Sequence, residues 1–272
     1  MLIFAIARQE LLIASRNLWV AISISLLALF NAVLTIAGDA PTGVLGVDPL
    51  TIALTSITTL SVYLIPLIGL LLSFDAISGE KERGTLTLSL SYPLSRLEIL
   101  FGKFLAHITV MAVAIGIGLG VSFTLVALQH GVDDLAVAPL LRLFFTSLAL
   151  GATFLGVGYA VSSAVRQTGA ASGIAIAIWL VCIVLYDLAL LAALVADGSG
   201  FFSKMIFPWL LIANPADAFR LLNTPDASVN LLSTGLAAAG SVSGFVGQAV
   251  SLASWPFFAM LLSWLVFKKV EP

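Results

Sequence analysis

The chain has 272 residues, of which 60% are apolar and only 10% are charged, and its formal net charge is −2. Soluble domains are about 45–50% apolar and about 25% charged, so a mean hydropathy of +1.14 excludes an ordinary soluble enzyme and a disordered chain. The near-neutral charge offers no basic face to a nucleic acid. A single cysteine, Cys182, excludes a disulfide framework and a cysteine-rich metal site. The composition predicts a membrane protein.

Six runs of the sequence are long and apolar enough to cross a bilayer as helices. A hydrocarbon core of about 30 Å needs roughly 20 mostly apolar residues, and each run must satisfy its own backbone hydrogen bonds in lipid. The predicted spans are Leu18–Ala37, Ile52–Phe74, Phe104–Leu128, Leu143–Val165, Ala170–Ala196 and Val250–Phe267. An alternative seventh span near Val229–Val250 is disfavoured because it is rich in Gly, Ser and Ala. The sequence thus predicts an all-α membrane protein without a separate soluble domain.

The distribution of Lys and Arg predicts that both termini face the cytoplasm. With the N-terminus inside, nine basic residues lie on the cytoplasmic side and only three on the outer side. The outer three are Arg142, Lys204 and Arg220. Residues 1–17 mix apolar side chains with Arg8, Glu10 and Arg16, which is the pattern of an interfacial helix that lies flat before the first span. A solvated tail is the alternative.

The longest cytoplasmic loop, residues 75–103, carries the densest charge cluster and is named the charged loop. Four consecutive charged residues, Glu80 to Arg83, lie between Gly79 and Gly84. Headgroup anchoring of two spans does not require such a run. Alternating signs suit the docking of a soluble partner, because charge pattern sets register and selectivity. We therefore interpret the charged loop as a docking site, with headgroup anchoring as the alternative.

Local signals in the charged loop predict helices on both sides of Pro93. The leucines of Thr85–Tyr92 fit a strand or a helix face, and a helix is favoured because a lone strand would have no partner. Ser95 and Glu98 match a capping box, in which each side chain binds the backbone N–H of the other residue. The helix of the third span is therefore predicted to begin at Arg96.

The outer segment, residues 197–247, is too long for a simple hairpin. Asn214 as a cap, Pro215 at the first helical position and Asp217 in the first turn predict a short helix that ends near Leu222. We expect one or two short helices at the outer leaflet, and an ordinary loop packed on the span ends is the alternative.

A search for catalytic groups finds none that could act together. Gly102-Lys103 is no phosphate loop, because Phe104 stands where Ser or Thr is needed. His107 and His130 lie near opposite faces of the membrane. The sequence therefore predicts no enzyme and no metal site in this chain.

Asp187 is a carboxylate in the outer half of the fifth predicted span. A charge at the centre of a span costs roughly 2.5–3.5 kcal/mol, and less near an interface. Asp187 either lines a transport route or outer gate, or is a hydrogen-bonded carboxyl that fixes helix packing. The sequence leaves both interpretations open.

Motifs of the charged loop resemble the permease subunits of type-2 ABC exporters. They are Ile-Ser-Gly-Glu-Lys-Glu-Arg-Gly-Thr-Leu at residues 77–86 and Ser-Tyr-Pro-Leu-Ser-Arg at residues 91–96. The resemblance covers the whole chain and implies one permease domain over residues 1–272, with no cofactor of its own. It implies that the charged loop docks on a separate ATPase that binds Mg-ATP. The implied coupling residues are Glu80, Lys81, Glu82, Arg83, Tyr92, Pro93, Ser95 and Arg96.

Residues 208–223 and Tyr186-Asp187-Leu188 are similar to the NosY-like permeases of the exporter that matures nitrous-oxide reductase. Phe219 and Ala216 stand where tyrosine and threonine are expected. The similarity implies a homodimer of permeases in the lipid of the bacterial inner membrane. It implies three kinds of partner: membrane lipid, two ATPase copies and a periplasmic copper-loading accessory protein. The whole complex would serve assembly of a copper–sulfur centre. The implied landing surface for that protein is Trp209, Asn214, Pro215, Asp217 and Arg220. The alternatives are an exporter of an unrelated drug, ion or lipid-linked cargo, and a scaffold that transmits ATPase motion without passing a solute.

Overall fold

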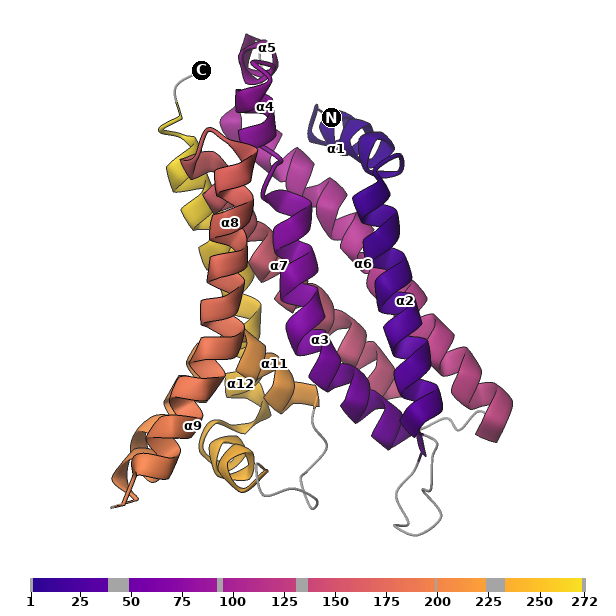
Figure 1. The fold of residues 1–272 in the computed structure, drawn as a ribbon, viewed down its shortest axis with the longest axis vertical. Coiled ribbons are helices and arrows are strands. Elements are labelled where there is room, and N and C mark those ends of the chain that lie inside the picture. The colour runs from indigo at the N-terminus through magenta and orange to yellow at the C-terminus, as the bar shows by residue number, and fades with distance from the viewer. Residues whose placement is uncertain are drawn as a thin grey trace.

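The computed structural model describes residues 2–38, 49–91, 95–130, 137–198, 200–223 and 233–270. Within these ranges the chain forms helices and turns but no strand. The long helices run side by side, and both termini lie at the same end of the bundle (Figure 1). The all-α prediction is confirmed, because long apolar runs satisfy their backbone groups internally only as helices.

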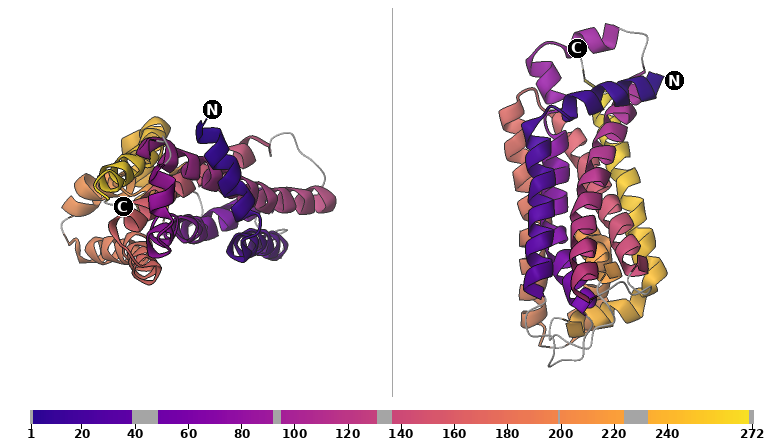
Figure 2. Two further views of the ribbon diagram at one scale, coloured as in Figure 1. Left: turned by 90° about the horizontal axis from the view of Figure 1, so that it is seen from above. Right: turned by 90° about the vertical axis from the view of Figure 1, so that its right-hand side faces the viewer.

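The predicted N-terminal helix is α1 (Leu2–Ala14), which a short turn joins to α2 (Leu18–Gly38). Helix α1 lies crosswise to α2 and packs on α6 (Arg96–His130) (Figure 2). A glycine makes this packing close, since a Cβ atom at Gly102 would lie 2.7 Å from the Cβ of Ile6. The crosswise direction of α1 is that expected of an interfacial helix.

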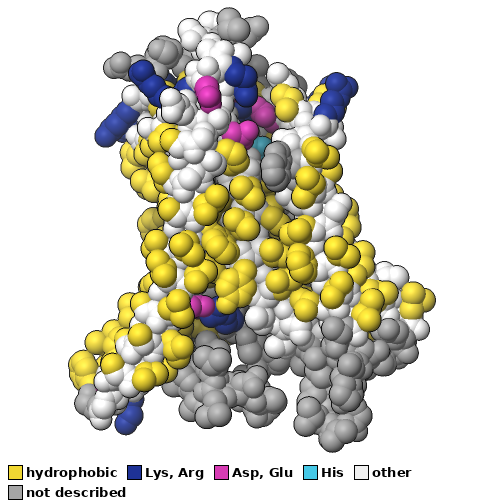
Figure 3. All heavy atoms as spheres, in the orientation of Figure 1, with side chains coloured by type: hydrophobic (Ala, Val, Ile, Leu, Met, Phe, Trp, Pro, Cys, Tyr) yellow, Lys and Arg dark blue, Asp and Glu magenta, His cyan; other side chains and the backbone are white. Residues whose placement is uncertain are grey.

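The other predicted spans also form helices. They are α3 (Pro49–Ser73), α6, α7 (Val137–Ala164), the continuous run of α8 (Thr168–Trp179), η3 (Leu180–Leu185) and α9 (Tyr186–Ala196), and α12 (Ser233–Phe267). Among the described residues, five helices are long and apolar enough to cross a membrane, and Val20–Ile36 of α2 is a shorter apolar helix. Hydrophobic side chains form a broad band next to the end at which most of the charged side chains gather (Figure 3). A multi-pass protein follows, while the sixth crossing and the orientation stay predictions.

Helix α12 is broken at Gly244, whose φ of 59° and ψ of 168° are not helical. A φ in this left-handed region favours glycine, which has no Cβ. The apolar helix that could span the membrane is Gly244–Phe267, so it begins before the predicted Val250. Of the alternative seventh span, residues 229–232 lie outside the described residues, and the described part from Ser233 is interrupted at Gly244.

The core of the bundle is built around α7, which packs against α3 on one side and α12 on another. Leu150, Leu155 and Tyr159 of α7 are fully buried. A Cβ atom at Gly156 would lie 2.7 Å from the Cβ of Ala259, so the small residues set the approach of α7 and α12.

The charged loop stands at the end of the bundle that holds both termini (Figure 1). It forms α4 (Ser78–Glu82) and α5 (Leu86–Ser91), which confirms the helix preferred for the leucine-rich stretch. The capping box is also confirmed, because Ser95 N donates to Glu98 Oε2 at 2.8 Å and Glu98 N donates to Ser95 Oγ at 3.2 Å. Helix α6 begins at Arg96, as predicted.

The outer segment lies at the opposite end, and its described residues form three short helices before α12. They are η4 (Phe202–Ile206), α10 (Phe207–Ala213) and α11 (Pro215–Asn223). Ala216 N donates to Asn214 Oδ1 at 2.9 Å, so the predicted cap starts α11. Helices α10 and α11 pack against α12, which holds them on the bundle.

Candidate functional site

The first turn of α4 is fixed by a hydroxyl group of α7. The backbone N–H groups of Ile77 and Ser78 both donate to Ser162 Oγ at 2.9 Å. Because the first N–H groups of a helix have no partner within it, the Ser162 oxygen acts as a cap supplied from another helix. All three residues are buried. The start of helix α4 is therefore held against α7 by two buried hydrogen bonds.

Glu80 of α4 pairs with a buried cation. Lys103 Nζ on α6 lies 2.7 Å from Glu80 Oε1 and also pairs with the carboxylate of Glu10 on α1. Only 6% of the Lys103 side chain and 17% of each acidic side chain are exposed. Since a charge removed from water is costly unless it is paired, this cation depends on both carboxylates. One ammonium group thus joins α1, α4 and α6.

Lys81 and Glu82 bind the two helix ends that meet at the turn between α7 and α8. Lys81 Nζ donates to the carbonyl oxygens of Ser163 and Val165, the latter at 3.2 Å. Glu82 Oε2 accepts hydrogen bonds from the N–H of Thr168, at 3.0 Å, and from its hydroxyl, at 2.7 Å. A cation at a helix C-terminus and an anion at an N-terminus both match the helix dipole. Helix α4 is therefore bonded to both α7 and α8.

Arg96 makes the corresponding contact with the end of α12. Its Nη1 donates to the carbonyl oxygens of Phe267, at 2.8 Å, and Val270. Its guanidinium carbon lies 5.8 Å from the centroid of the Phe267 ring. The start of α6 and the end of α12 are thereby tied together. Tyr92 and Pro93, two further predicted coupling residues, lie outside the described residues.

The exposed part of the charged loop is smaller than its charge count suggests. Three of the four consecutive charged residues, Glu80, Lys81 and Glu82, bond to helices of the bundle. Glu82 and Arg83 are exposed. Helix α5 adds the exposed side chains of Thr87 and Ser91. Within the described residues, the exposed surface of the charged loop thus includes Arg83, Thr87 and Ser91.

A polar cavity of about 400 Å³ adjoins this junction, among α1, α2, α3, α4 and α6. Its ionisable lining consists of Glu10, Asp75, Glu80, Arg83, Lys103 and His107. His107 Nδ1 lies 2.5 Å from the hydroxyl of Tyr159 on α7. In Figure 3, acidic and histidine side chains gather in a hollow above the hydrophobic band. The cavity can hold a small polar molecule, since one water molecule occupies about 30 Å³.

At the opposite end, Arg220 of α11 bridges two carboxylates. Its Nη2 lies 2.9 Å from Asp187 Oδ2 on α9, and its Nη1 lies 2.8 Å from Asp217 Oδ1. Asp217 is fully buried, whereas Asp187 keeps 28% of its side chain exposed. Burial raises the pKa of the Asp217 carboxyl to about 7, although the Arg220 charge acts to lower it. This cluster joins the fifth predicted span to the outer segment.

Further hydrogen bonds hold α10 and α11 against the same span. The Tyr186 hydroxyl donates to the carbonyl oxygen of Leu210 at 2.7 Å, and Asn214 Nδ2 donates to that of Cys182 at 3.0 Å. Cys182 lies in η3, a π-helical stretch. Asn214 therefore has two functions, since its side chain also caps α11.

The residues predicted as an outer landing surface are not equally accessible. Trp209 is 63% exposed, but Asn214, Pro215 and Asp217 are buried. Arg220 keeps 21% of its side chain exposed. A partner at this end therefore meets Trp209 and the edge of the Arg220 cluster.

Sequence reasoning did not identify several residues that the structure brings into these sites. Glu10 and Lys103 are separate charges beside apolar stretches, and a charge in that setting needs a partner. The sequence therefore indicates that each of them forms an ion pair, but not with which residue. No sequence pattern points to Ser162 or Thr168, because their importance depends on which helix end lies next to α4.

A bundle of apolar helices with a helical loop bonded across several span ends is the architecture of a membrane transport subunit. The chain belongs to the ABC-2 family transporter proteins, whose family model matches residues 4–271. It is 41% identical over 226 residues to the "Probable ABC transporter permease protein NosY" of Pseudomonas aeruginosa, covering 81% of each chain. It is 35% identical over 283 residues to the protein of the same name in Stutzerimonas stutzeri, covering 98% of each chain.

These similarities confirm the resemblance of the charged-loop and outer-segment motifs to this family. The chain is a transporter permease and not an enzyme, and the ATPase is a separate subunit. Its long apolar helices make it a multi-pass membrane protein.

Proposed function

We propose that this permease belongs to an exporter that serves assembly of the copper–sulfur centre of nitrous-oxide reductase in the bacterial inner membrane. The similarity to the NosY permease of Stutzerimonas stutzeri over 98% of both chains carries this proposal. The cargo is then a sulfur species or a component of copper delivery.

A deletion strain tests this role. Without the gene, reductase purified from the periplasm is expected to lack the absorption and copper content of the complete copper–sulfur centre, and the wild-type gene is expected to restore both. A complete centre in the deletion strain would favour the unrelated-cargo alternative and exclude the proposed role.

In this proposal the ATPase docks on α5 and Arg83. Two ATPase copies, each binding Mg-ATP, act on a permease homodimer. Two observations support this location: Thr87 and Ser91 are exposed, and α5 lies at the outermost point of its end of the bundle (Figure 1). Behind this surface, α4 is bonded to α6, α7 and α8. Force applied by the ATPase to the charged loop would therefore move three helices together.

Docking and transmission can be separated by two kinds of variant. The pair Thr87→Arg and Ser91→Arg changes only the exposed face, so we expect it to abolish co-purification of the ATPase. Glu82→Ala removes the bond to Thr168, so the ATPase is expected to bind but its hydrolysis to be uncoupled from the permease. Arg16→Gln is the matched control at the same end. If the α5 variants still recruit the ATPase, the docking surface is assigned wrongly.

A second candidate function is to transmit motion to a periplasmic partner. The Arg220 cluster is the observation that supports it. The ion pair with Asp187 lets the outer segment follow the fifth span. Trp209→Ala is expected to weaken binding of the accessory protein while ATPase binding is retained. Equal binding of that protein by the variant and the wild type would remove Trp209 from the landing surface.

A further inference from the structure

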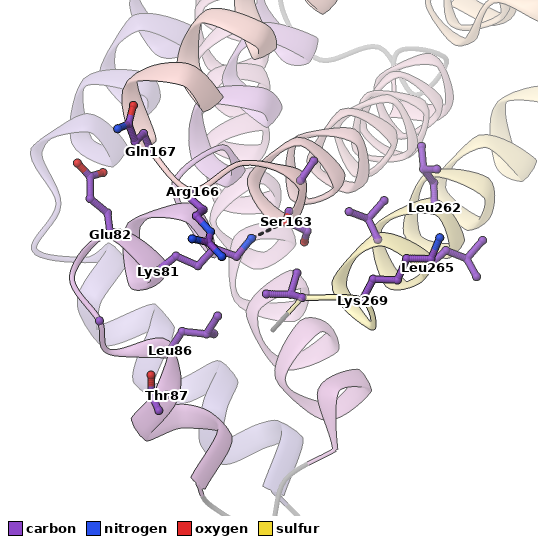
Figure 4. Close-up of a pocket in the computed structure, with 14 residues that line it drawn as sticks. Lys81, Glu82, Leu86, Thr87, Ser163, Arg166, Gln167, Leu262, Leu265 and Lys269 are labelled. Carbon is purple, nitrogen blue, oxygen red and sulfur yellow. Dashed lines mark hydrogen bonds between the residues drawn. The ribbon is translucent and has the colours of Figure 1, made fainter. Parts of the chain in front are cut away.

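A groove of about 860 Å³ opens between the charged loop, the turn that joins α7 to α8, and the end of α12 (Figure 4). Its lining carries three basic side chains, Lys81, Arg166 and Lys269, and one acidic side chain, Glu82. These residues come from three separate parts of the chain. The groove is therefore a product of the tertiary fold.

The basic side chains leave an excess of positive charge in this groove. The Glu82 carboxylate is already bonded to the N-terminus of α8 through Thr168. Arg166 and Lys269 are exposed, and within the described part of the chain neither forms an ion pair. In Figure 4 the head groups of Lys81 and Arg166 lie beside one another, which places like charges together. An anion bound between them would relieve this repulsion.

One wall of the groove is apolar and belongs to a helix long enough to span the membrane. Leu262, Leu265 and Val266 of α12 line it, with Leu262 52% exposed and Leu265 37% exposed. Lys269 lies just beyond the last residue of the span, Phe267, whereas the leucines lie within the span. With α12 spanning a bilayer, the groove would extend from the headgroups into the hydrocarbon.

We propose that this groove binds an anionic phospholipid, with its phosphate among Lys81, Arg166 and Lys269 and an acyl chain along Leu262 and Leu265 of α12. Basic pockets between spanning helices bind anionic headgroups by the same physics. An acidic peptide or a free phosphate would match the cations but would leave the apolar wall uncovered. The bound lipid would join the charged loop to the end of α12. This inference does not depend on the cargo.

Native mass spectrometry of the detergent-purified permease, titrated with phosphatidylglycerol or phosphatidylcholine, tests the site. The variant Arg166→Gln/Lys269→Gln removes two groove cations, and its control Arg16→Gln/Lys268→Gln removes two cations at the same end that do not line the groove. We expect wild type and control to retain phosphatidylglycerol in preference to phosphatidylcholine. The groove variant is expected to bind it roughly tenfold or more weakly.

Two further measurements separate a lipid from other anions. Leu262→Ser alters only the apolar wall and is expected to weaken phosphatidylglycerol binding. Glycerol phosphate, which has no acyl chain, is expected to compete poorly. Equal lipid binding by the groove and control variants, or full competition by glycerol phosphate, would overturn the proposal. Displacement of the lipid whenever the ATPase is bound would assign the groove to an acidic segment of the ATPase instead.

Discussion

The carboxylate of Glu82 accepts hydrogen bonds from both the backbone N–H and the hydroxyl of Thr168, the first residue of α8. The two residues are 86 positions apart in the chain, yet together they form the N-terminal cap of the fifth predicted span. A residue that sequence patterns assign to partner docking thus also fixes a spanning helix. The charged loop is consequently part of the bundle as well as the proposed docking surface for the ATPase.

The first prediction concerns this cap. Glu82→Ala removes the acceptor at the N-terminus of α8, so the first-turn amides of α8 should exchange with solvent deuterium faster than in the wild type. Glu82→Gln keeps an oxygen acceptor and should retain most of the protection. Hydrogen–deuterium exchange of the peptides that start at Thr168 measures both. Equal exchange in the alanine variant and the wild type would show that Glu82 does not cap α8.

The second prediction concerns the buried cation of Lys103. Lys103→Met leaves the carboxylates of Glu10 and Glu80 close together and without their cation, which should lower stability by about 3 kcal/mol. The triple variant that also carries Glu10→Gln and Glu80→Gln leaves no unpaired charge and should recover much of the loss. Thermal unfolding in detergent compares the two. A triple variant less stable than Lys103→Met alone would contradict an electrostatic origin of the effect.

The third prediction is a pH dependence at Asp217. Its pKa in the fold is about 7, above the ordinary 3.8, so the fold prefers the protonated carboxyl. The resulting stabilisation is fully present below about pH 4 and is lost as the pH rises through about 7. Asp217→Asn cannot ionise, so the variant should gain stability relative to the wild type over this interval.

The difference in melting temperature between Asp217→Asn and the wild type, measured from pH 4 to pH 8, isolates this contribution. Arg220 and Asp187, the charged neighbours of Asp217, are present in both proteins and should largely cancel. A difference that does not change with pH would place the Asp217 pKa near its ordinary value.

The fourth prediction concerns helix packing. A methyl group added at Gly156 would lie 2.7 Å from the Cβ of Ala259, so Gly156→Ala should force α7 and α12 apart and cost about 1–3 kcal/mol. Gly120→Ala is the matched control, because no atom lies within 4 Å of a Cβ at that position. The control should be neutral or slightly stabilising. Thermal unfolding of the two variants under the same conditions measures the two changes in stability. Equal losses of stability in both variants would rule out close packing of α7 against α12.

Local features of this protein could be predicted well because their causes are local. Long apolar runs become helices in the predicted places, since hydrocarbon offers the backbone no other partner. The capping residues Ser95 and Asn214 start α6 and α11, because each cap requires only its own side chain and the next few N–H groups. The break at Gly244 was not predicted, because an isolated glycine in an apolar run does not reveal its φ angle.

The sequence by itself determined the membrane class, the approximate spans and the charged residues that had to find partners. Only the tertiary structure decided which partners they found: Lys103 pairs with Glu10 across 93 positions, and Arg220 pairs with Asp187 across 33. The physical reason is that burial among the helices removes a charge from water, so the charge needs an opposite charge nearby. Helix packing, and not distance along the sequence, decides which opposite charge lies within reach.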